Sequence, residues 1–313
     1  MKTLALLGMI TLVATAADIR IGIVGTDTSH VTAFTKMLND PAAPDHVAGA
    51  RVVAAYKGGS PDLDESRNRI DRFTNELKDK WQVKIVDSIE DLCKQVDAVL
   101  LTSVDGRIHL AQARTVIQAH KPLFIDKPLA STLEDAREIA RLAKEAGVPW
   151  FSASSLRFGG IAALHTGEVE GATTWGPGPL EPHHHLDLAW YAIHPVELLF
   201  TLMGTGCEEV TRISTPGEDV VVGRWKGGRI GTVRALRPYG EYGAVVFRKN
   251  AKGQSAESSM KVNDGYAPLV REIVQFFQTG RPPVSNEATL EIFAFLDAAQ
   301  RSKDAGGKPM ILR

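Results

Sequence analysis

Between residues 19 and 154 the chain alternates short apolar runs with longer amphipathic stretches, and this alternation constrains the fold more than any other feature. The apolar runs, rich in Val, Ile, Leu and Phe, cover residues 19–25, 51–56, 97–103, 122–126 and 148–154. Continuous apolar runs of this length are typical of strands that are buried on both faces of a sheet. Because helix-like stretches lie between them, for example residues 108–120 and 132–147, the pattern predicts a doubly wound, mostly parallel sheet.

The helix predicted over residues 132–147 also has the expected end signals. Ser131 or Thr132 can cap its start, and Gly147 can end it. The charged stretch 59–80 is periodic as well, and we interpret it as a solvated helix face.

The pattern changes after about residue 157. A stretch rich in Gly and Pro, residues 173–185, precedes a helix predicted over residues 194–204. Three strand-like segments follow over residues 219–225, 229–236 and 243–249, and two final helices over residues 268–280 and 286–307. Turn-forming residues at 226–228 and 250–253 predict antiparallel hairpins between the strands. We therefore predict a Rossmann-type α/β domain over residues 18–156. An α+β domain with a mainly antiparallel open sheet follows over residues 157–313.

The first 17 residues have the composition of a secretory signal peptide. Lys2 precedes an apolar run, residues 4–13, and the small residues 14–17 provide an A-x-A-like cleavage site. A first strand or a membrane anchor are the alternatives, but the run is shorter than the roughly 20 residues that a membrane helix needs. We expect residues 1–17 to be removed, and the mature chain to be exported, periplasmic and free of the membrane.

Charge and cysteine content exclude some partners and leave others open. The formal net charge of −1 gives no basic footprint, so we expect no nucleic acid partner. Cys93 and Cys207 are too few for a disulfide framework, although one bridge between them is possible. Three adjacent histidines, residues 183–185, resemble a metal site, but side chains of neighbouring residues point in divergent directions. We predict no metal there and place this stretch on a substrate-pocket wall or a surface turn.

The turn after the first predicted strand is where a doubly wound fold binds a nucleotide. Compared with the fingerprint G-x-G-x-x-G/A, Gly25 fits the first glycine, but Asp27 and His30 take the second and third positions. A carboxylate at Asp27 would repel a pyrophosphate unless it is protonated, turned away or paired with a cation. The hydroxyl groups of Thr28 and Ser29 and the free amides of the helix N-terminus can still bind an anion. Alternatively, Asp27, Ser29 and His30 form a polar cluster, either catalytic in itself or a helix cap with a neighbouring histidine.

Lys57 follows the second predicted strand. An acid at this place binds the ribose 2′-hydroxyl of NAD, whereas a cation accommodates the 2′-phosphate of NADP. Lys57 therefore favours NADP, and a solvated loop lysine is the alternative.

Residues 99–130 resemble the glucose-fructose oxidoreductase / inositol 2-dehydrogenase / MocA (Gfo/Idh/MocA) family. His109 matches the histidine of the family's T-P-N-x-x-H turn, and Lys127 follows at the family's spacing. The triplet 126–128, Asp-Lys-Pro, stands for the family's E-K-P, but residues 104–106 are Val-Asp-Gly where the family has Thr-Pro-Asn. The likeness extends over the mature chain, including residues 192–204 and 276–303.

The second domain also resembles this family, with departures. Aligned on residues 194–199, His194 is the family's catalytic histidine, but Trp190 and Ala192 replace the aspartate and glycine that precede it in the family's D-x-G-x-H segment. Asp187 is a candidate to take the place of that aspartate. Arg157 lies where the family often has a polar residue on the substrate side.

The resemblance implies an NAD(P)-dependent oxidoreductase that acts on a carbohydrate- or polyol-like hydroxyl compound and forms a homo-oligomer. It places Lys127 beside the nicotinamide, hydrogen-bonded to a substrate hydroxyl, with His194 as the general base. We expect cofactor contacts from Gly25, Asp27, Thr28, Ser29, His30, Lys57, Ser103, His109, Asp126 and Lys127, and substrate contacts from Arg157, His185, Asp187 and Tyr191. An exported member must hold its cofactor tightly, since no free nicotinamide pool is expected outside the cytoplasm. Alternatives are a lyase or hydrolase that oxidises its sugar transiently, and a non-catalytic binding relative with a degraded cofactor site.

Overall fold

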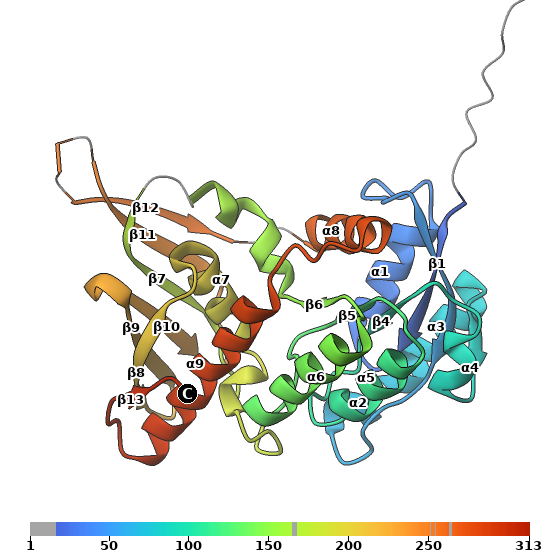
Figure 1. Cartoon of the computed structure of the whole chain (residues 1–313), viewed down its shortest axis with the longest axis horizontal. Coiled ribbons are helices and arrows are strands. Elements are labelled where there is room, and N and C mark those ends of the chain that lie inside the picture. The colour runs from blue at the N-terminus through green and yellow to red at the C-terminus, as the bar shows by residue number, and fades with distance from the viewer. Residues whose placement is uncertain (1–16, 165–167, 251, 254, 263–264) are drawn as a thin grey trace, which may run out of the picture.

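The computed structural model describes residues 17–164, 168–250, 252–253, 255–262 and 265–313 (Figure 1). The expected signal peptide lies outside the described residues, apart from Ala17. Two domains stand side by side, each with its own sheet. Within the described part of the chain, no helix has the length and apolar character needed to cross a bilayer.

Six parallel strands form the first sheet, in the order β3-β2-β1-β4-β5-β6. The strands are β1 (Ile19–Val24), β2 (Ala50–Tyr56), β3 (Lys84–Val86), β4 (Ala98–Leu101), β5 (Leu123–Ile125) and β6 (Trp150–Ser152). The helices of this half are α1 (Ser29–Asn39), α2 (Asp64–Arg67), α3 (Ile70–Trp81), α4 (Ile89–Cys93), α5 (His109–Gln118) and α6 (Leu133–Ala146). Helices α1 and α3 pack on one face of the sheet and α4, α5 and α6 on the other, which confirms the predicted doubly wound fold. The strand order reverses between β1 and β4, and the crevice at such a point is where these folds bind ligands.

Local sequence signals explain where the helices begin and end. The Thr132 side chain accepts the N–H of Asp135 at 3.0 Å and caps α6. Gly147 ends the helix in the left-handed conformation, with φ of 66°. The charged stretch 59–80 contains two helices, the short α2 and then α3.

Seven strands form the second sheet, in the order β12-β11-β7-β10-β9-β8-β13. The strands are β7 (Val169–Pro177), β8 (Cys207–Ser214), β9 (Glu218–Trp225), β10 (Ile230–Leu236), β11 (Gly243–Lys249), β12 (Ser255–Lys261) and β13 (Met310–Ile311). Only β7 and β10 run parallel among these pairs, so the prediction of a mainly antiparallel sheet is confirmed. Helices α7 (Ile193–Met203) and α9 (Asn286–Asp304) pack against this sheet.

Residues 173–177 of the Gly/Pro-rich stretch belong to β7, a strand that was not predicted from the sequence. Glycines occur in this strand where neighbouring groups approach closely. A Cβ on Gly171 would lie 2.8 Å from the carbonyl oxygen of Ile230, and one on Gly176 would lie 2.4 Å from the ring of Tyr242. The Gly/Pro-rich composition therefore did not indicate a strand, because the glycines are required by close neighbouring groups in the sheet.

Helix α8 (Ala267–Thr279) returns to the first domain, where Figure 1 shows it beside α1. Its residues Leu269, Val270 and Ile273 join the same buried cluster as Phe34 of α1. The ring of Phe276 meets that of Phe151 in β6 edge-on, with centroids 5.1 Å apart. Helix α9 also contacts both domains, through α6 and β6 on one side and β8 on the other.

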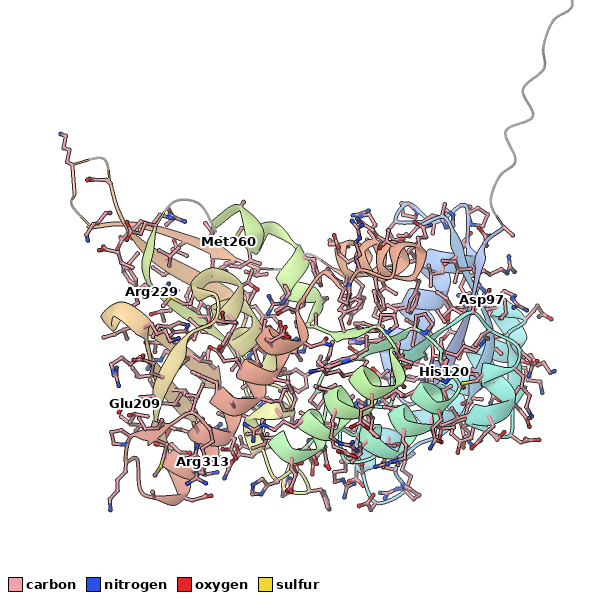
Figure 2. All side chains as sticks on the ribbon, viewed as in Figure 1. Asp97, His120, Glu209, Arg229, Met260 and Arg313 are labelled. Atoms are coloured by element: carbon pink, nitrogen blue, oxygen red, sulfur yellow. The ribbon has the colours of Figure 1, made fainter. Side chains whose placement is uncertain are left out.

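The two cysteines are buried free thiols in different domains, Cys93 in α4 and Cys207 in β8, so the possible bridge is not formed. Figure 2 labels two charged side chains on opposite sides of the molecule, Asp97 in the first domain and Glu209 in the second. Asp97 pairs there with Arg20 at 2.7 Å. This exposed pair contributes little to stability.

Candidate functional site

A pocket of about 380 Å³ lies between the domains at the carboxyl ends of the first sheet's strands, and we call it the interdomain pocket. Its volume falls within the roughly 300–1,000 Å³ usual for small-molecule sites. The first domain lines it with Thr28, Ser29, His30, Glu65, Arg69, Val104 and Lys127. From residue 155 onward, the chain contributes Ser155, Leu156, Trp190, Tyr191, His194, Tyr239, Tyr242, Val262, Gly265 and Tyr266.

Lys127 lies directly after β5, as predicted, and its side chain reaches the pocket. Its backbone N–H donates to the Asp126 carboxylate at 2.8 Å, and its Nζ lies 5.4 Å from the centre of the Tyr191 ring. Desolvation lowers the pKa of Lys127, and the neighbouring Asp126 charge opposes this shift without reversing it. The amine therefore releases a proton more readily than a solvated lysine does.

His194 enters the pocket from the second domain, at the start of α7. Its Nδ1 lies 2.7 Å from the hydroxyl oxygen of Ser154, which fixes the ring. Desolvation holds the pKa of His194 well below its usual value, and the charges of Lys127 and His30 lower it further. The structure thus brings Lys127 and a neutral imidazole into one pocket, while their catalytic roles stay predictions.

His30 adds a third titratable group to this pocket. Its Nδ1 forms an ion pair with the buried Asp126 carboxylate, and its ring lies 4.7 Å from that of Tyr266. Burial raises the pKa of Asp126, but the charges of His30 and Lys127 and the hydrogen bonds from both residues together outweigh burial, so the pKa is lowered. The cap of α1 is Thr28, and not Asp27 or Ser29 of the predicted polar cluster; its side chain accepts the His30 N–H at 3.4 Å.

Asp27 is fully buried and does not line the pocket. Its Oδ1 accepts the Val104 N–H at 3.0 Å and its Oδ2 accepts the Ser66 hydroxyl at 2.6 Å. Burial raises the pKa of Asp27, against the effect of these hydrogen bonds. Of the three arrangements considered for this carboxylate, the structure shows the one in which it is turned into the protein.

Three other predicted cofactor contacts are internal or distant. His109 is buried, with Nε2 2.7 Å from the Ser103 carbonyl oxygen, and the Ser103 hydroxyl donates to Gln112 at 2.9 Å. Lys57 forms an ion pair with Asp71 at 2.6 Å on the surface. None of the three lines the interdomain pocket.

Of the four predicted substrate residues, only Tyr191 lines the interdomain pocket. Arg157 pairs with the buried Glu197 at 2.6 Å. Asp187 does not replace the family's aspartate, because it binds Arg212 at 2.7 Å and Lys303 at 2.6 Å. His185 is exposed and lies in a separate surface hollow beside α6. Neither the histidine run nor any other part of the described chain gathers three His, Cys, Asp or Glu side chains that could hold a metal ion.

The strand pattern did not reveal the aromatic lining of the pocket. Four of the chain's five tyrosines line it: Tyr191, Tyr239, Tyr242 and Tyr266. Three of these come from loops that carry no motif, so only their concentration in the second domain could have indicated them. Glu65 and Arg69, at the opposite wall, were taken for a solvated helix face.

The turn after β1 does not fit the pyrophosphate of a dinucleotide in this structure. The amides of Gly25 and Thr26 donate to the carbonyl oxygens of Tyr56 and Lys57, at 3.0 and 2.9 Å, and are not available to an anion. The buried Asp27 carboxylate stands where the fingerprint has a glycine that lets the pyrophosphate approach the backbone. We therefore assign no chemical step to a dinucleotide at this turn.

The buried histidines make stability depend on pH. Below about pH 6.5, His194 is protonated in the unfolded chain but stays neutral in the folded chain, where its pKa is lowered. The free energy of unfolding therefore falls as pH falls, by at most about 1.4 kcal/mol per pH unit. Between pH 7 and pH 5.5, we expect the free energy of unfolding to fall by about 1 kcal/mol less in His194→Gln than in the wild type. Urea unfolding at the two pH values measures this difference. His185→Gln, an exposed control, should keep the wild-type loss. Parallel curves for wild type and His194→Gln would contradict the prediction.

Comparisons with known proteins agree with this architecture. Residues 19–154 match the profile of an oxidoreductase family with an NAD-binding Rossmann fold, GFO_IDH_MocA. The chain is 46% identical over 67 residues to a 1,5-anhydro-D-fructose reductase of Ensifer adhaerens, covering 21% of this chain and 20% of the relative. It is 36% identical over 126 residues to inositol 2-dehydrogenase 1 of Saccharopolyspora erythraea, covering 39% and 32%. The chain thus matches a third or less of the length of these curated relatives.

Solved structures share the fold across both domains. A myo-inositol 2-dehydrogenase from Lactobacillus plantarum aligns with a TM-score of 0.73 at 14% identity, covering 95% of this chain and 100% of the other. A myo-inositol dehydrogenase from Lactobacillus casei, in complex with NAD(H) and myo-inositol, aligns with a TM-score of 0.71 at 17% identity, covering 95% and 97%. At these identities the likeness shows the fold alone.

Proposed function

Since the chain belongs to the Gfo/Idh/MocA oxidoreductase family through its first domain, we propose that it acts on a CH–OH group of a carbohydrate- or polyol-like molecule in the interdomain pocket. One observation carries the proposal: Lys127 and His194 come from different domains and meet in one pocket lined by four tyrosines. Aromatic faces suit the C–H surfaces of such a ligand, and the few polar groups orient its hydroxyls.

The residues present can perform the proton transfer of such a reaction. The Lys127 ammonium donates a hydrogen bond to the substrate hydroxyl oxygen and stabilises the negative charge that develops there. His194, neutral because it is buried, accepts the hydroxyl proton. Its hydrogen bond with Ser154 holds the ring in place during the transfer.

The match of residues 19–154 to a family with an NAD-binding Rossmann fold supports a nicotinamide as the hydride carrier. The similar L. casei structure holds NAD(H). The predicted preference for NADP has little support, because Lys57 is paired with Asp71. The buried Asp27 carboxylate favours a second candidate, in which the pocket binds the same class of ligand without a nicotinamide.

We also propose that the mature chain is exported and forms a homo-oligomer. The signal-like N-terminus supports export. Exposed apolar side chains on four strands of the second sheet support self-association; they are Ile213, Val222, Ile230 and Phe247. N-terminal sequencing of the exported chain and sedimentation analysis would check these two points.

Calorimetric titration with a panel of polyols, aldoses and glycosides tests the proposal, with NAD(P) present and absent. We expect at least one of these compounds to bind, and Tyr239→Ala to weaken it by about fivefold to tenfold because an aromatic wall is lost. His185→Ala, which removes another exposed ring outside the pocket, is the matched control and should bind as the wild type does. A panel that gives no binding, or equal weakening in both variants, would contradict the proposal.

A further inference from the structure

Residues 57–69 connect β2 to α3 and include α2, and we call them the covering segment. We infer that the covering segment permanently occupies the place of the pyrophosphate of a dinucleotide, so that the interdomain pocket takes its small ligand without NAD(P) on the turn after β1. The inference rests on the proposed function only for the class of ligand in the pocket. It is carried by hydrogen bonds and ion pairs that join the covering segment to this turn.

The first connection runs through the departure at the second fingerprint glycine. The Ser66 hydroxyl donates to Asp27 Oδ2 at 2.6 Å, and the Ser60 N–H donates to the same hydroxyl oxygen at 2.8 Å. All three side chains are buried, and the Val104 N–H satisfies the other Asp27 oxygen. The acid is therefore a structural acceptor for the covering segment, and a pyrophosphate placed against it would meet a buried carboxyl group instead of a glycine.

The second connection involves the departure at Asp105, where the family has proline. Arg107 forms a two-pronged pair with Asp62 of the covering segment, at 2.8 and 3.0 Å, and also binds Asp105 at 2.7 Å. Asp105 is fully buried and lies 3.1 Å from Nε2 of His184 in the second domain. This network ties the covering segment to the β4–α5 turn and, through it, to the second domain.

The backbone closes the remaining space. The Thr26 N–H and hydroxyl both donate to the Lys57 carbonyl oxygen, at 2.9 and 3.3 Å. A Cβ on Gly58 would lie 3.3 Å from Cα of Gly25, so the covering segment lies directly on the turn. Asp27 and Asp105, the two departures from the family's motifs, thus both take part in the contacts that hold the covering segment on the turn. Two other residues of this segment, Glu65 and Arg69, line the interdomain pocket.

Direct titration of the purified mature chain with NADH and NADPH, followed by fluorescence, tests the inference. We expect no saturable binding up to about 1 mM, the upper end of ordinary KM values. No nicotinamide should appear in the supernatant after denaturation. Saturable binding below that concentration, or nicotinamide that copurifies, would overturn the inference.

Hydrogen exchange of the covering segment tests its anchoring. In the wild type we expect protected amides at residues 60 and 66, and at least a tenfold faster exchange in Ser66→Ala, which loses the bond to Asp27. Asp64→Ala is the matched control, since Asp64 is exposed and pairs only with Arg67 of the same segment among the described contacts. Wild-type amides that exchange as fast as those of an unfolded chain would overturn the inference.

The outcomes separate this inference from the proposed function. A chain that binds a polyol but no NADH supports the inference and the second candidate function, in which the pocket binds this class of ligand without a nicotinamide. Binding of NADH overturns the inference and leaves the hydroxyl chemistry of the pocket intact. A chain that binds neither contradicts the proposed function alone.

Discussion

Lys127→Met should turn over its substrate about 10²–10⁴-fold more slowly than the wild type, the usual loss when a positioned acid–base group is removed. The same variant should be more stable, by about 0.5–2 kcal/mol. Both effects have one cause: the ammonium is desolvated beside the pocket, which lowers its pKa, and methionine fills the space without a charge. Under the first candidate function, initial rates with NAD(P) as hydride acceptor and a substrate found in the panel measure the first effect, and urea unfolding at pH 7 measures the second.

Lys94→Met is the control for this variant. Lys94 is exposed and pairs with Asp91 one helical turn away, so its removal should change neither rate nor stability by much. A Lys127→Met enzyme with an unchanged rate would remove Lys127 from the mechanism. A variant that loses both rate and stability would show that the lysine is structural.

Arg212→Met should lower the free energy of unfolding by about 3 kcal/mol, because it removes a buried cation that binds two carboxylates. Arg212 is buried in the second domain, where its Nε donates to Asp219 at 2.8 Å and its Nη1 to Asp187 at 2.7 Å. We expect the loss to stay near 3 kcal/mol because Asp219 keeps Arg237 and Asp187 keeps Lys303. Urea unfolding measures the change.

Arg224 on the adjacent strand β9 gives a matched control. It pairs with Glu208 at 2.8 Å, but both side chains are about half exposed. Arg224→Met should therefore cost about 0–1 kcal/mol. Equal losses in the two variants would mean that burial does not decide the contribution of these ion pairs.

The first domain could be predicted from sequence because each of its signals is local. Helix α6 has a capping threonine at its start and a left-handed glycine at its end, and both act within a few residues. The second domain was harder. Strands β7, β8, β12 and β13 were not predicted, nor was the short β3 of the first domain. The glycines of β7 are explained only by groups far along the chain, such as Tyr242.

The same reasoning separates the parts of the site. Lys127 and His194 could be anticipated because motif spacing and family resemblance identify them. The bond between Asp27 and Ser66 could not, because no sequence rule pairs a carboxylate with one particular serine of a distant charged stretch. His185 and Asp187 were assigned to the pocket because they lie shortly before His194, but of the predicted substrate residues only Tyr191 lines it.

The return of α8 to the first sheet means that the two halves of this protein are not separable modules. A fragment that stopped at residue 156 would expose Phe34 and Phe151 to water, because the helix that shields them is encoded more than a hundred residues later. Gene fusion or recombination between the halves would therefore cut through a single folding unit.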